Sequence, residues 1–321
     1  MKIAVVILNW NGKKLLEQFL PSVIAYSNRA EIYVIDNAST DNSVLFLQKN
    51  YPEIKLIRLD KNYGYAGGYN KGLQHINADI LALINSDLEV TPGWLQPVIQ
   101  EFEQYDETAI VQPKIKDYQN KNKFEYAGAA GGFIDLFGYP YCDGRILSKV
   151  EEDQGQYNRR KEIFWASGAC FFIRKPVFDQ LEGFDESFFA HQEEIDLCWR
   201  AHHKSYKTIY IPQSTVYHMG GASLQSQNPF KTYLNFRNNL LMLLKNLPVS
   251  MIFPVIFIRL MLDGLAGIIF VIQGKPQHTW AIVKAHFGFY KRIPEAWQRR
   301  PDKPVTDYYQ TFSIFIKKMI K

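Results

Sequence analysis

The chain has 321 residues, of which 47% are hydrophobic and 21% charged, and its formal net charge is +5. This length is sufficient for one large or two modest domains, and the hydrophobic content excludes disorder over most of the chain. The three cysteines, Cys142, Cys170 and Cys198, are too few and too scattered for a disulfide framework or a zinc site. A reducing, cytoplasmic setting fits them.

Four apolar runs in the first 90 residues predict buried parallel strands. They are short, continuous and rich in Ile, Val and Leu, which is typical of strands covered on both faces. They lie at Ile3–Leu8, Ile32–Ile35, Ile54–Leu59 and Ile80–Ile84. The first run is too short for a signal peptide and has no small-residue cleavage site after it, so it is also expected to be a strand.

Helical patterns separate these runs, at about 13–26, 41–50 and 66–76, and Thr40 or Asp41 is a candidate cap for the second helix. The alternation predicts an open α/β sheet, and such sheets bind ligands beyond the carboxyl ends of their strands.

The section from about 110 to 225 is irregular and rich in glycine and aromatic residues. We expect strands at 163–173 and 206–211 and a helix at 192–203.

The most apolar stretch, Leu247–Ile272, is long enough to span a bilayer. Arg259 and Asp263 oppose a span, because each costs about 2.5–3.5 kcal/mol near the bilayer centre. Being four residues apart, they can pair on one helix face, and Pro254 is expected to kink the segment. We expect a helix that lies on or re-enters a membrane, with a soluble core helix and a true span as alternatives.

The net charge is unevenly placed. Gly274–Lys321 holds ten Lys and Arg against three Asp and Glu, a net of +7, whereas the rest of the chain has a net of −2. Basic and aromatic side chains alternate in this tail, which suits a lipid headgroup region. An anionic membrane surface, rather than nucleic acid, is therefore the expected partner.

Two polar segments follow predicted strands. Asp36, in VIDNASTDNS, can accept a hydrogen bond from a base N–H or a ribose hydroxyl, although a turn with a helix cap explains the same residues. KNYGYAGGYNKG opens a helix with Gly64, Gly67 and Gly68, which let the backbone approach a ligand. A Rossmann dinucleotide site is excluded, because here the glycines follow the third strand and the acid precedes them.

Further polar residues are candidates for metal binding and for proton transfer. Asp87, with Asn85 nearby, offers oxygen ligands to a divalent ion that also holds a diphosphate. His218 can add an imidazole, although a lone histidine is more often structural. Glu193 and Glu194 start a predicted helix, where the helix dipole also favours acids, and either can serve as a general base for a hydroxyl.

In this order the elements resemble the family 2 inverting glycosyltransferases of the GT-A fold, particularly their rhamnosyltransferase-like branch. The resemblance covers roughly residues 3–223 and is carried by VVILNWNG, IDNASTDNS, NYGYAGGYN, INSD, WASGACFFIRK, GFDESFFAHQEEIDLCWRA and VYHMGGAS. It implies the GT-A (nucleotide-diphospho-sugar transferase) fold, an α/β fold with a mixed, mostly parallel central sheet flanked by helices.

The expected domains are a catalytic domain over 1–225 and a C-terminal helical, apolar and basic extension over 226–321 that associates with a membrane. Within the catalytic domain we expect a nucleotide-binding half at about 1–90 and an acceptor half at about 91–225.

The resemblance also implies how the donor is held. Asn9 and Asp36 would line the nucleoside pocket, with Asp36 reading the pyrimidine. Asn62 and Gly67 would approach the ribose and the sugar-phosphate. Arg237, in YLNFRNNL, aligns loosely with a basic residue that can clamp the diphosphate.

For metal and catalysis the resemblance implies Asp87 as the ligand of Mg²⁺ or Mn²⁺, assisted by His218. The metal turn departs from Asp-x-Asp, so Asn85 supplies only a neutral ligand. Glu194 falls where the family usually has the aspartate that acts as general base. Because it is one methylene longer, Glu193 remains an alternative base.

The implied acceptor site has Trp165 and the Ser167–Gly168 turn as its floor. The implied reaction moves a sugar from a UDP- or dTDP-sugar to a glycan or lipid-linked glycan in surface polysaccharide synthesis. The expected location is the cytoplasm, peripherally at the inner face of the cell membrane. The alternatives are a sugar-phosphate nucleotidyltransferase and a non-catalytic, membrane-associated protein that binds nucleotide sugars.

Overall fold

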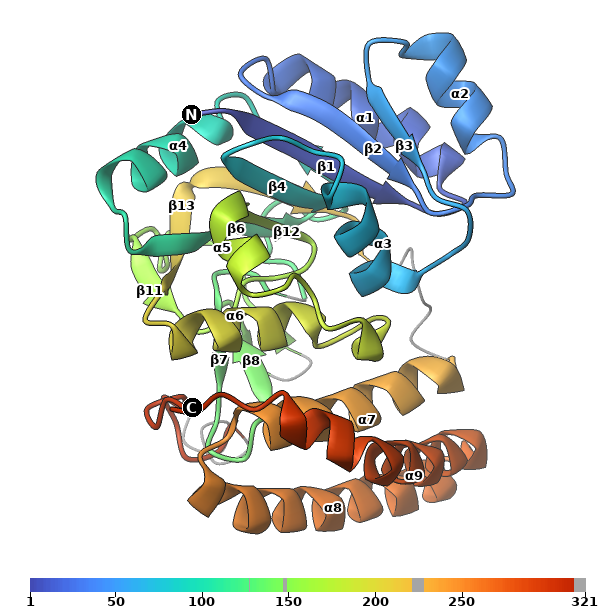
Figure 1. The fold of residues 1–321 in the computed structure, drawn as a ribbon, viewed down its shortest axis with the longest axis vertical. Helices are drawn as coiled ribbons and strands as arrows, with labels where there is room; N and C mark the ends of the chain where they lie inside the picture. Colours follow the sequence, from blue (N-terminus) through green and yellow to red (C-terminus); the bar gives the residue numbers. More distant parts are fainter. Residues whose placement is uncertain (127, 147–148, 221–227, 315–321) are drawn as a thin grey trace. The chain divides into compact units, whose positions relative to one another are not determined.

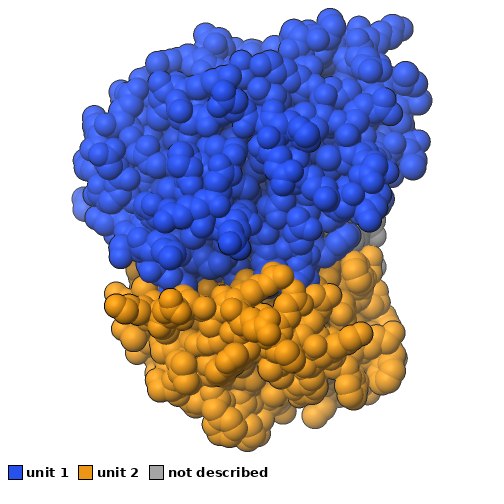
Figure 2. Space-filling view, viewed as in Figure 1, with its two compact units in different colours: residues 1–132, 141–189, 193–220 blue, residues 133–140, 190–192, 221–321 orange. Residues whose placement is uncertain are grey.

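The computed structural model describes residues 1–126, 128–146, 149–220 and 228–314. The chain divides into two compact units, which Figure 2 shows in different colours. The first comprises 1–132, 141–189 and 193–220; the second comprises 133–140, 190–192 and the described part of 221–321. The predicted boundary at 225 and the last residues of VYHMGGAS (221–223) lie outside the described residues.

The first unit is built on a nine-stranded sheet (Figure 1). Its strands are β1 (Ile3–Asn9), β2 (Glu31–Asp36), β3 (Lys55–Arg58), β4 (Ile80–Asn85), β5 (Leu88–Val90), β6 (Thr108–Asp117), β11 (Lys161–Ile163), β12 (Cys170–Arg174) and β13 (Lys207–His218). Their order is β11-β13-β6-β12-β4-β1-β2-β3, with β5 beside β13. Strands β1 to β4, β6 and β13 run one way, and β5, β11 and β12 run against them. The sheet is mixed and mostly parallel, as predicted.

Helices flank this sheet. They are α1 (Lys13–Tyr26), α2 (Ser43–Asn50), α3 (Gly64–Leu73), α4 (Leu95–Gln104), α5 (Lys175–Gln180) and α6 (Glu193–His203), with a 3₁₀ turn, η1, at Glu186–Phe188. Ile3, Val5 and Ile7 of β1 share a core with apolar residues of α1, α2 and α4. On the other face, Gly68 of α3 lies so close to Leu8 that a Cβ there would come within 2.9 Å of it. Both faces are covered, which explains the continuous apolarity of the strand.

The predicted strand at 163–173 is wrong in its middle. Ile163 ends β11, Cys170 begins β12, and residues 164–169 form no strand. The chain changes neighbours in this interval, because β11 pairs with β13 whereas β12 pairs with β4 and β6. The WASGA motif (165–169) is therefore part of the loop that connects β11 to β12.

Four short strands form a second sheet. They are β7 (Gly132–Ile134), β8 (Pro140–Cys142), β9 (Arg145–Ile146) and β10 (Lys149–Val150), in the order β10-β9-β8-β7. Cys142 pairs with Arg145 and Lys149 with Ile146, both antiparallel.

The second unit contains α7 (Pro229–Asn246), α8 (Val249–Ile272) and α9 (Pro276–Gln298), which pack on one another (Figure 1). Helix α8 continues through Pro254. Among the described residues it is the one helix long and apolar enough to cross a membrane, although most of its apolar surface is not buried.

The two charges of α8 face the interior of this unit. Arg259 and Asp263 are 4% and 1% exposed and form the predicted pair, at 3.9 Å. Arg259 also donates to the carbonyl of Phe137, and Asp263 lies 3.2 Å from His286. The charges are therefore satisfied by protein groups, whichever surface the opposite face meets.

Candidate active site

Asn9 and Asp36 lie side by side at the carboxyl ends of β1 and β2, where they are paired in register. The side-chain amide of Asn9 donates to Asp36 Oδ1 and to Ser39 Oγ, each at 3.2 Å. Both residues are buried. Asn9 Oδ1 has no hydrogen-bond partner among the described residues, and a Cβ on Gly12 would lie 2.4 Å from that oxygen. The strand ends thus present one carboxylate and one unused acceptor.

Asn37 organises the loop that follows β3, a role that the sequence alone did not reveal. Its Nδ2 donates to Asn62 Oδ1 at 3.0 Å and to the Gly64 carbonyl at 2.9 Å, and its Oδ1 accepts from the Tyr63 amide at 3.0 Å. The side chain of Asn62 is thereby held against its own loop. Asn37 follows Asp36 directly, and this position beyond a parallel strand was the one available sign of its importance.

The glycines of α3 allow close packing. The amides of Tyr65 and Ala66, in the first turn, donate to the carbonyl of Phe189 at 2.8 and 3.4 Å. A Cβ on Gly67 would lie 3.0 Å from the Cβ of Tyr63. The role of Gly67 at the sugar-phosphate stays a prediction.

Asp87 and His218, which were predicted to ligate a metal, lie next to each other. His218 Nε2 lies 3.1 Å from Asp87 Oδ1 and 3.3 Å from the side-chain nitrogen of Asn85, while His218 Nδ1 lies 3.4 Å from Glu125. Burial alone lowers the pKa of His218, but hydrogen bonds with Asp87 and Glu125 raise it to about 10. In the described part of the chain, no three His, Cys, Asp or Glu side chains form a complete metal-binding group.

These groups fit a divalent cation that is shared with a ligand. A buried carboxylate oxygen and an imidazole nitrogen point at each other, and a second carboxylate, from Glu125, supports the far side of the ring. Carboxylate oxygens suit Mg²⁺ and Mn²⁺, and His218 can add a nitrogen ligand once it has lost its extra proton. A diphosphate can provide the remaining oxygen ligands.

The two glutamates at the start of α6 differ in environment. Glu193 is 4% exposed, and its Oε2 has no hydrogen-bond partner among the described residues. Glu194 is half-buried and lies against the Gly168 turn, where a Cβ on the glycine would be 3.6 Å from the carboxyl carbon. Tyr65 joins α3 to the same turn by donating to the Gly168 carbonyl at 2.8 Å.

The electrostatic environment of Glu193 distinguishes the two glutamates as candidates for the general base. Burial, and then the neighbouring charge of Glu194, raise the pKa of Glu193 well above its ordinary value. Glu193 therefore keeps its proton more readily than a solvated glutamate does. A base must be ionised to accept a proton, so this arrangement favours Glu194 for that task.

The other predicted acceptor residues lie within the same unit. The Ser167 amide donates to Gln112 Oε1 at 2.8 Å, and Gln112 donates to the Gly128 carbonyl at 2.8 Å. Trp165 is 5% exposed and packs directly on Gly132. Ser167 and Gly168 thus belong to a rigid turn, and a role of Trp165 at a sugar stays a prediction.

Arg237 belongs to the second unit. It is 5% exposed, donates through Nε to Asn238 Oδ1 at 2.9 Å, and donates through Nη1 to the Tyr233 hydroxyl at 3.2 Å. Its predicted contact with a diphosphate stays a prediction.

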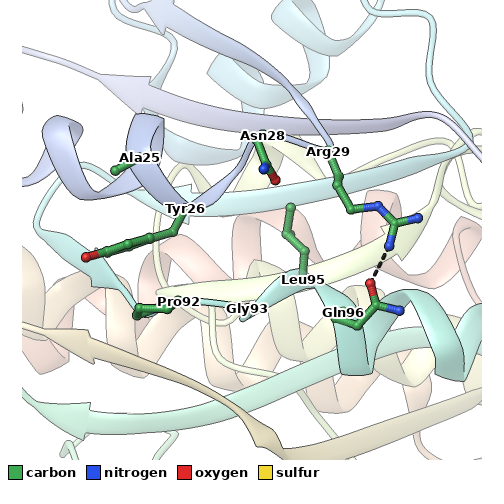
Figure 3. Close-up of a pocket in the computed structure, with 8 residues that line it drawn as sticks. All are labelled: Ala25, Tyr26, Asn28, Arg29, Pro92, Gly93, Leu95 and Gln96. Carbon is green, nitrogen blue, oxygen red and sulfur yellow. Dashed lines mark hydrogen bonds between the residues drawn. The ribbon is translucent and has the colours of Figure 1, made fainter.

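A surface pocket of about 200 Å³ lies elsewhere on the first unit (Figure 3). It is lined by the end of α1 and the start of α4, and Arg29 donates to Gln96 across it. Since α1 runs back from the end of β1, this pocket is at the opposite edge of the sheet from Asn9 and Asp36. It is not the predicted site.

Comparison with known proteins identifies one family, and the similar proteins include two glycan-synthesis transferases. Residues 4–182, more than half of the chain, match glycosyl transferase family 2. N-acetylglucosaminyl-diphospho-decaprenol L-rhamnosyltransferase of Mycobacterium tuberculosis is 23% identical over 233 residues, which cover 67% of this chain and 75% of that protein. The low-salt glycan biosynthesis hexosyltransferase Agl10 of Haloferax volcanii is 25% identical over 247 residues, 74% of each.

Solved structures share the fold at low sequence identity. The first 349 residues of S. aureus TarS superpose with a TM-score of 0.58 at 15% identity, covering 94% of this chain and 83% of that one. GalNAc-T7, solved with UDP, GalNAc and Mn²⁺, gives 0.60 at 18% identity; the match covers 78% of this chain and less than half, 48%, of that one. Mannosyltransferase PcManGT of Pyrobaculum calidifontis, solved with GDP-Man and Mn²⁺, gives 0.54 at 12% identity and covers 93% of this chain and 88% of that one. The predicted fold is confirmed.

Proposed function

This chain belongs to glycosyl transferase family 2, as its motifs predicted, and we propose that it is an inverting enzyme that uses a UDP- or dTDP-sugar. The proposed acceptor is a hydroxyl of a glycan or a lipid-linked glycan in surface polysaccharide synthesis. The observation that carries the inverting mechanism is the placement of half-buried Glu194 at the Gly168 turn, beside a buried Glu193 whose pKa is raised by burial.

The donor is held through its nucleoside and its phosphates. Asp36 and the unused Oδ1 of Asn9 offer acceptors to the N–H of a pyrimidine at the ends of β1 and β2. UDP and dTDP present nearly the same base edge to these atoms, so both remain candidates. Asp87 and His218 would hold Mg²⁺ or Mn²⁺, which supplies positive charge to the leaving diphosphate when bound.

Glu194 acts on the acceptor. Its carboxylate accepts the proton of the acceptor hydroxyl while that oxygen forms a bond to the anomeric carbon. The bond from the anomeric carbon to the phosphate oxygen breaks on the opposite face, and the electron pair leaves with the nucleoside diphosphate. This single displacement inverts the configuration.

The two alternatives fit less well. A nucleotidyltransferase needs a glycine-rich phosphate loop with a basic residue after the first strand. Here Asn11 follows β1, and its Oδ1 instead accepts from the Thr40 amide at 2.7 Å. A non-catalytic binding protein does not require a buried glutamate with a raised pKa beside a half-buried one.

Membrane attachment is part of the proposal and rests on one face of α8. This apolar face repeats at intervals of three or four residues and is exposed, with Phe253 and Ile272 78% and 79% exposed. It consists of Val249, Phe253, Phe257, Met261, Leu265, Ile268 and Ile272. Arg259 and Asp263 also bind Phe137 and His286, which lie outside α8. A helix that lies on the membrane keeps these contacts, whereas a span would remove both charges from them.

One experiment tests the catalytic proposal directly. A panel of UDP-, dTDP- and GDP-sugars is screened by thermal shift with Mn²⁺, and stabilising donors are assayed for nucleotide release with lipid-linked and free glycan acceptors. A uridine or thymidine donor that gives acceptor-dependent release supports the proposal. No acceptor-dependent release with any member of the panel counts against it.

A further inference from the structure

The segment that leads into the catalytic helix has an unusual backbone. Phe189, His191 and Gln192 have φ values of 65°, 70° and 75°, and none of them is a glycine. Such conformations persist only where the surroundings hold them. Glu193 follows directly, so the strained segment determines where α6 and its two glutamates begin.

Three buried polar atoms of this segment do not help to hold it. His191 Nε2, Gln192 Oε1 and Glu193 Oε2 are buried without a hydrogen-bond partner among the described residues. The forces that hold the backbone therefore act elsewhere. One is within the first unit, where the Phe189 carbonyl accepts from the amides of Tyr65 and Ala66 in α3.

The other is Asn238 of α7. This side chain is fully buried, and its Nδ2 donates to the carbonyls of Ala190 and His191 at 2.9 and 2.8 Å. Its Oδ1 accepts from Arg237 Nε at 2.9 Å, which fixes the orientation of the amide. Two hydrogens on consecutive carbonyls set the orientation of the peptide planes just before Glu193.

We infer that Asn238 is a positioning residue for the Glu193–Glu194 pair. It holds the backbone of Ala190 and His191 and so places the general base without touching the substrate. Asn238 should therefore affect the chemical step; its one link to a predicted donor residue is the hydrogen bond from Arg237 Nε, for which Asn238→Asp keeps an acceptor. This inference rests on the proposed function, because it takes Glu194 as the base.

Helix α7 provides a matched control in the next residue. Asn239 is also an asparagine, is 3% exposed, and donates to the carbonyl of Gly138 at 3.1 Å. It anchors the 133–140 segment, which does not lead to the base. Asn238→Asp keeps the shape of the side chain and removes both donated hydrogens, so it separates packing from hydrogen bonding.

The test compares the full-length Asn238→Ala, Asn238→Asp and Asn239→Ala variants with the parent protein. Since small displacements of a reacting group cost about 10²-fold, we expect both Asn238 variants to lose about that much in kcat. Donor KM and calorimetric donor Kd should stay within about twofold in Asn238→Asp, which keeps an acceptor for Arg237 Nε. Asn239→Ala should keep a kcat near that of the parent. Equal losses of kcat and of thermal midpoint in Asn238→Ala and Asn239→Ala would overturn the inference, because they would reduce Asn238 to a general structural role.

A second readout does not need turnover. Hydrogen exchange of peptides covering 186–198 should become faster in both Asn238 variants and remain unchanged in Asn239→Ala. Unchanged exchange in Asn238→Ala overturns the inference even if no donor is found. If the Asn238 variants exchange faster but the parent protein transfers no sugar, the anchoring is supported and the proposed function is refuted instead.

Discussion

His218 Nε2 lies 3.1 Å from Asp87 Oδ1, although 131 residues separate them in the chain. The parallel pairing of β13 with β6 and the antiparallel pairing of β13 with β5 bring the end of β13 to the turn after β4. The sheet thus brings together an aspartate and a histidine that are far apart in the sequence.

Asp87→Ala should abolish metal-dependent donor binding, because it removes the charged ligand. Calorimetric titration of UDP- or dTDP-sugar with and without Mn²⁺ measures this. Donor binding that is equally strong without metal in the parent would contradict the assignment.

Asn85→Asp should tighten Mn²⁺ binding. The substitution adds a carboxylate next to Asp87 and His218, and ligand charge is a main determinant of affinity, so we expect a roughly tenfold lower Kd for the metal. Titration of the two proteins with Mn²⁺ gives the comparison. An unchanged affinity would place Asn85 outside the metal site.

Glu194→Gln should lower kcat by about 10²–10⁴-fold, the usual contribution of a general base. Donor affinity should be preserved, since the carboxylate acts on the acceptor. Glu193→Gln replaces a buried acid, whose pKa is raised, with a neutral amide and should retain most of the activity. If the two variants behave in the opposite way, Glu193 is the base.

Glu193→Gln should also stabilise the protein at neutral pH. Its pKa is raised in the folded state above the ordinary 4.5, so above that pH the unfolded chain releases a proton that the folded chain retains, and stability falls as pH rises. Glutamine removes this penalty, with about 2–4 °C in Tm for each kcal/mol gained.

The gain in Tm should be present at pH 7.5 and absent below pH 4.5, and Glu53→Gln, at an exposed position, serves as control. An equal gain at both pH values would instead indicate better packing of the amide.

Phe253→Asp with Ile272→Asp should prevent flotation of the protein with anionic vesicles, because both side chains lie on the apolar face of α8. Leu45→Asp, at a 65% exposed position of α2, changes the same kind of side chain in the first unit and should float like the parent. Flotation of the double variant at the level of the parent would exclude this face as the anchor.

The beginning of the sheet and the residues at its carboxyl edge were accessible from sequence because their pattern is local. Continuous apolar runs predicted β1, β2 and β4, and the polar residues directly after them include Asp36 and Asp87. Strand β6 was not predicted, since Gln112 and Lys114 interrupt its apolar pattern. These residues are buried because each has a distant partner: Gln112 donates to Gly128, and Lys114 pairs with Asp153. No local sequence pattern indicates such partners.

The contrast between local patterns and distant partners also explains which features of α6 and its surroundings were predicted from the sequence. Glu193 and Glu194 follow from their motif, but the difference in their burial depends on the tertiary packing around α6. Asn238 carries no local sign of its role, because the two carbonyls that it binds lie 48 and 47 residues earlier.

The two asparagines of α7 have a consequence for exchanging parts between relatives. Asn238 and Asn239 bind backbone from 190–192 and 133–140, two stretches that interrupt the catalytic portion of the chain. A chimera that replaces only the C-terminal extension would therefore pair foreign helices with native loops. The transplantable piece is discontinuous, and a functional swap should need all three stretches to move together.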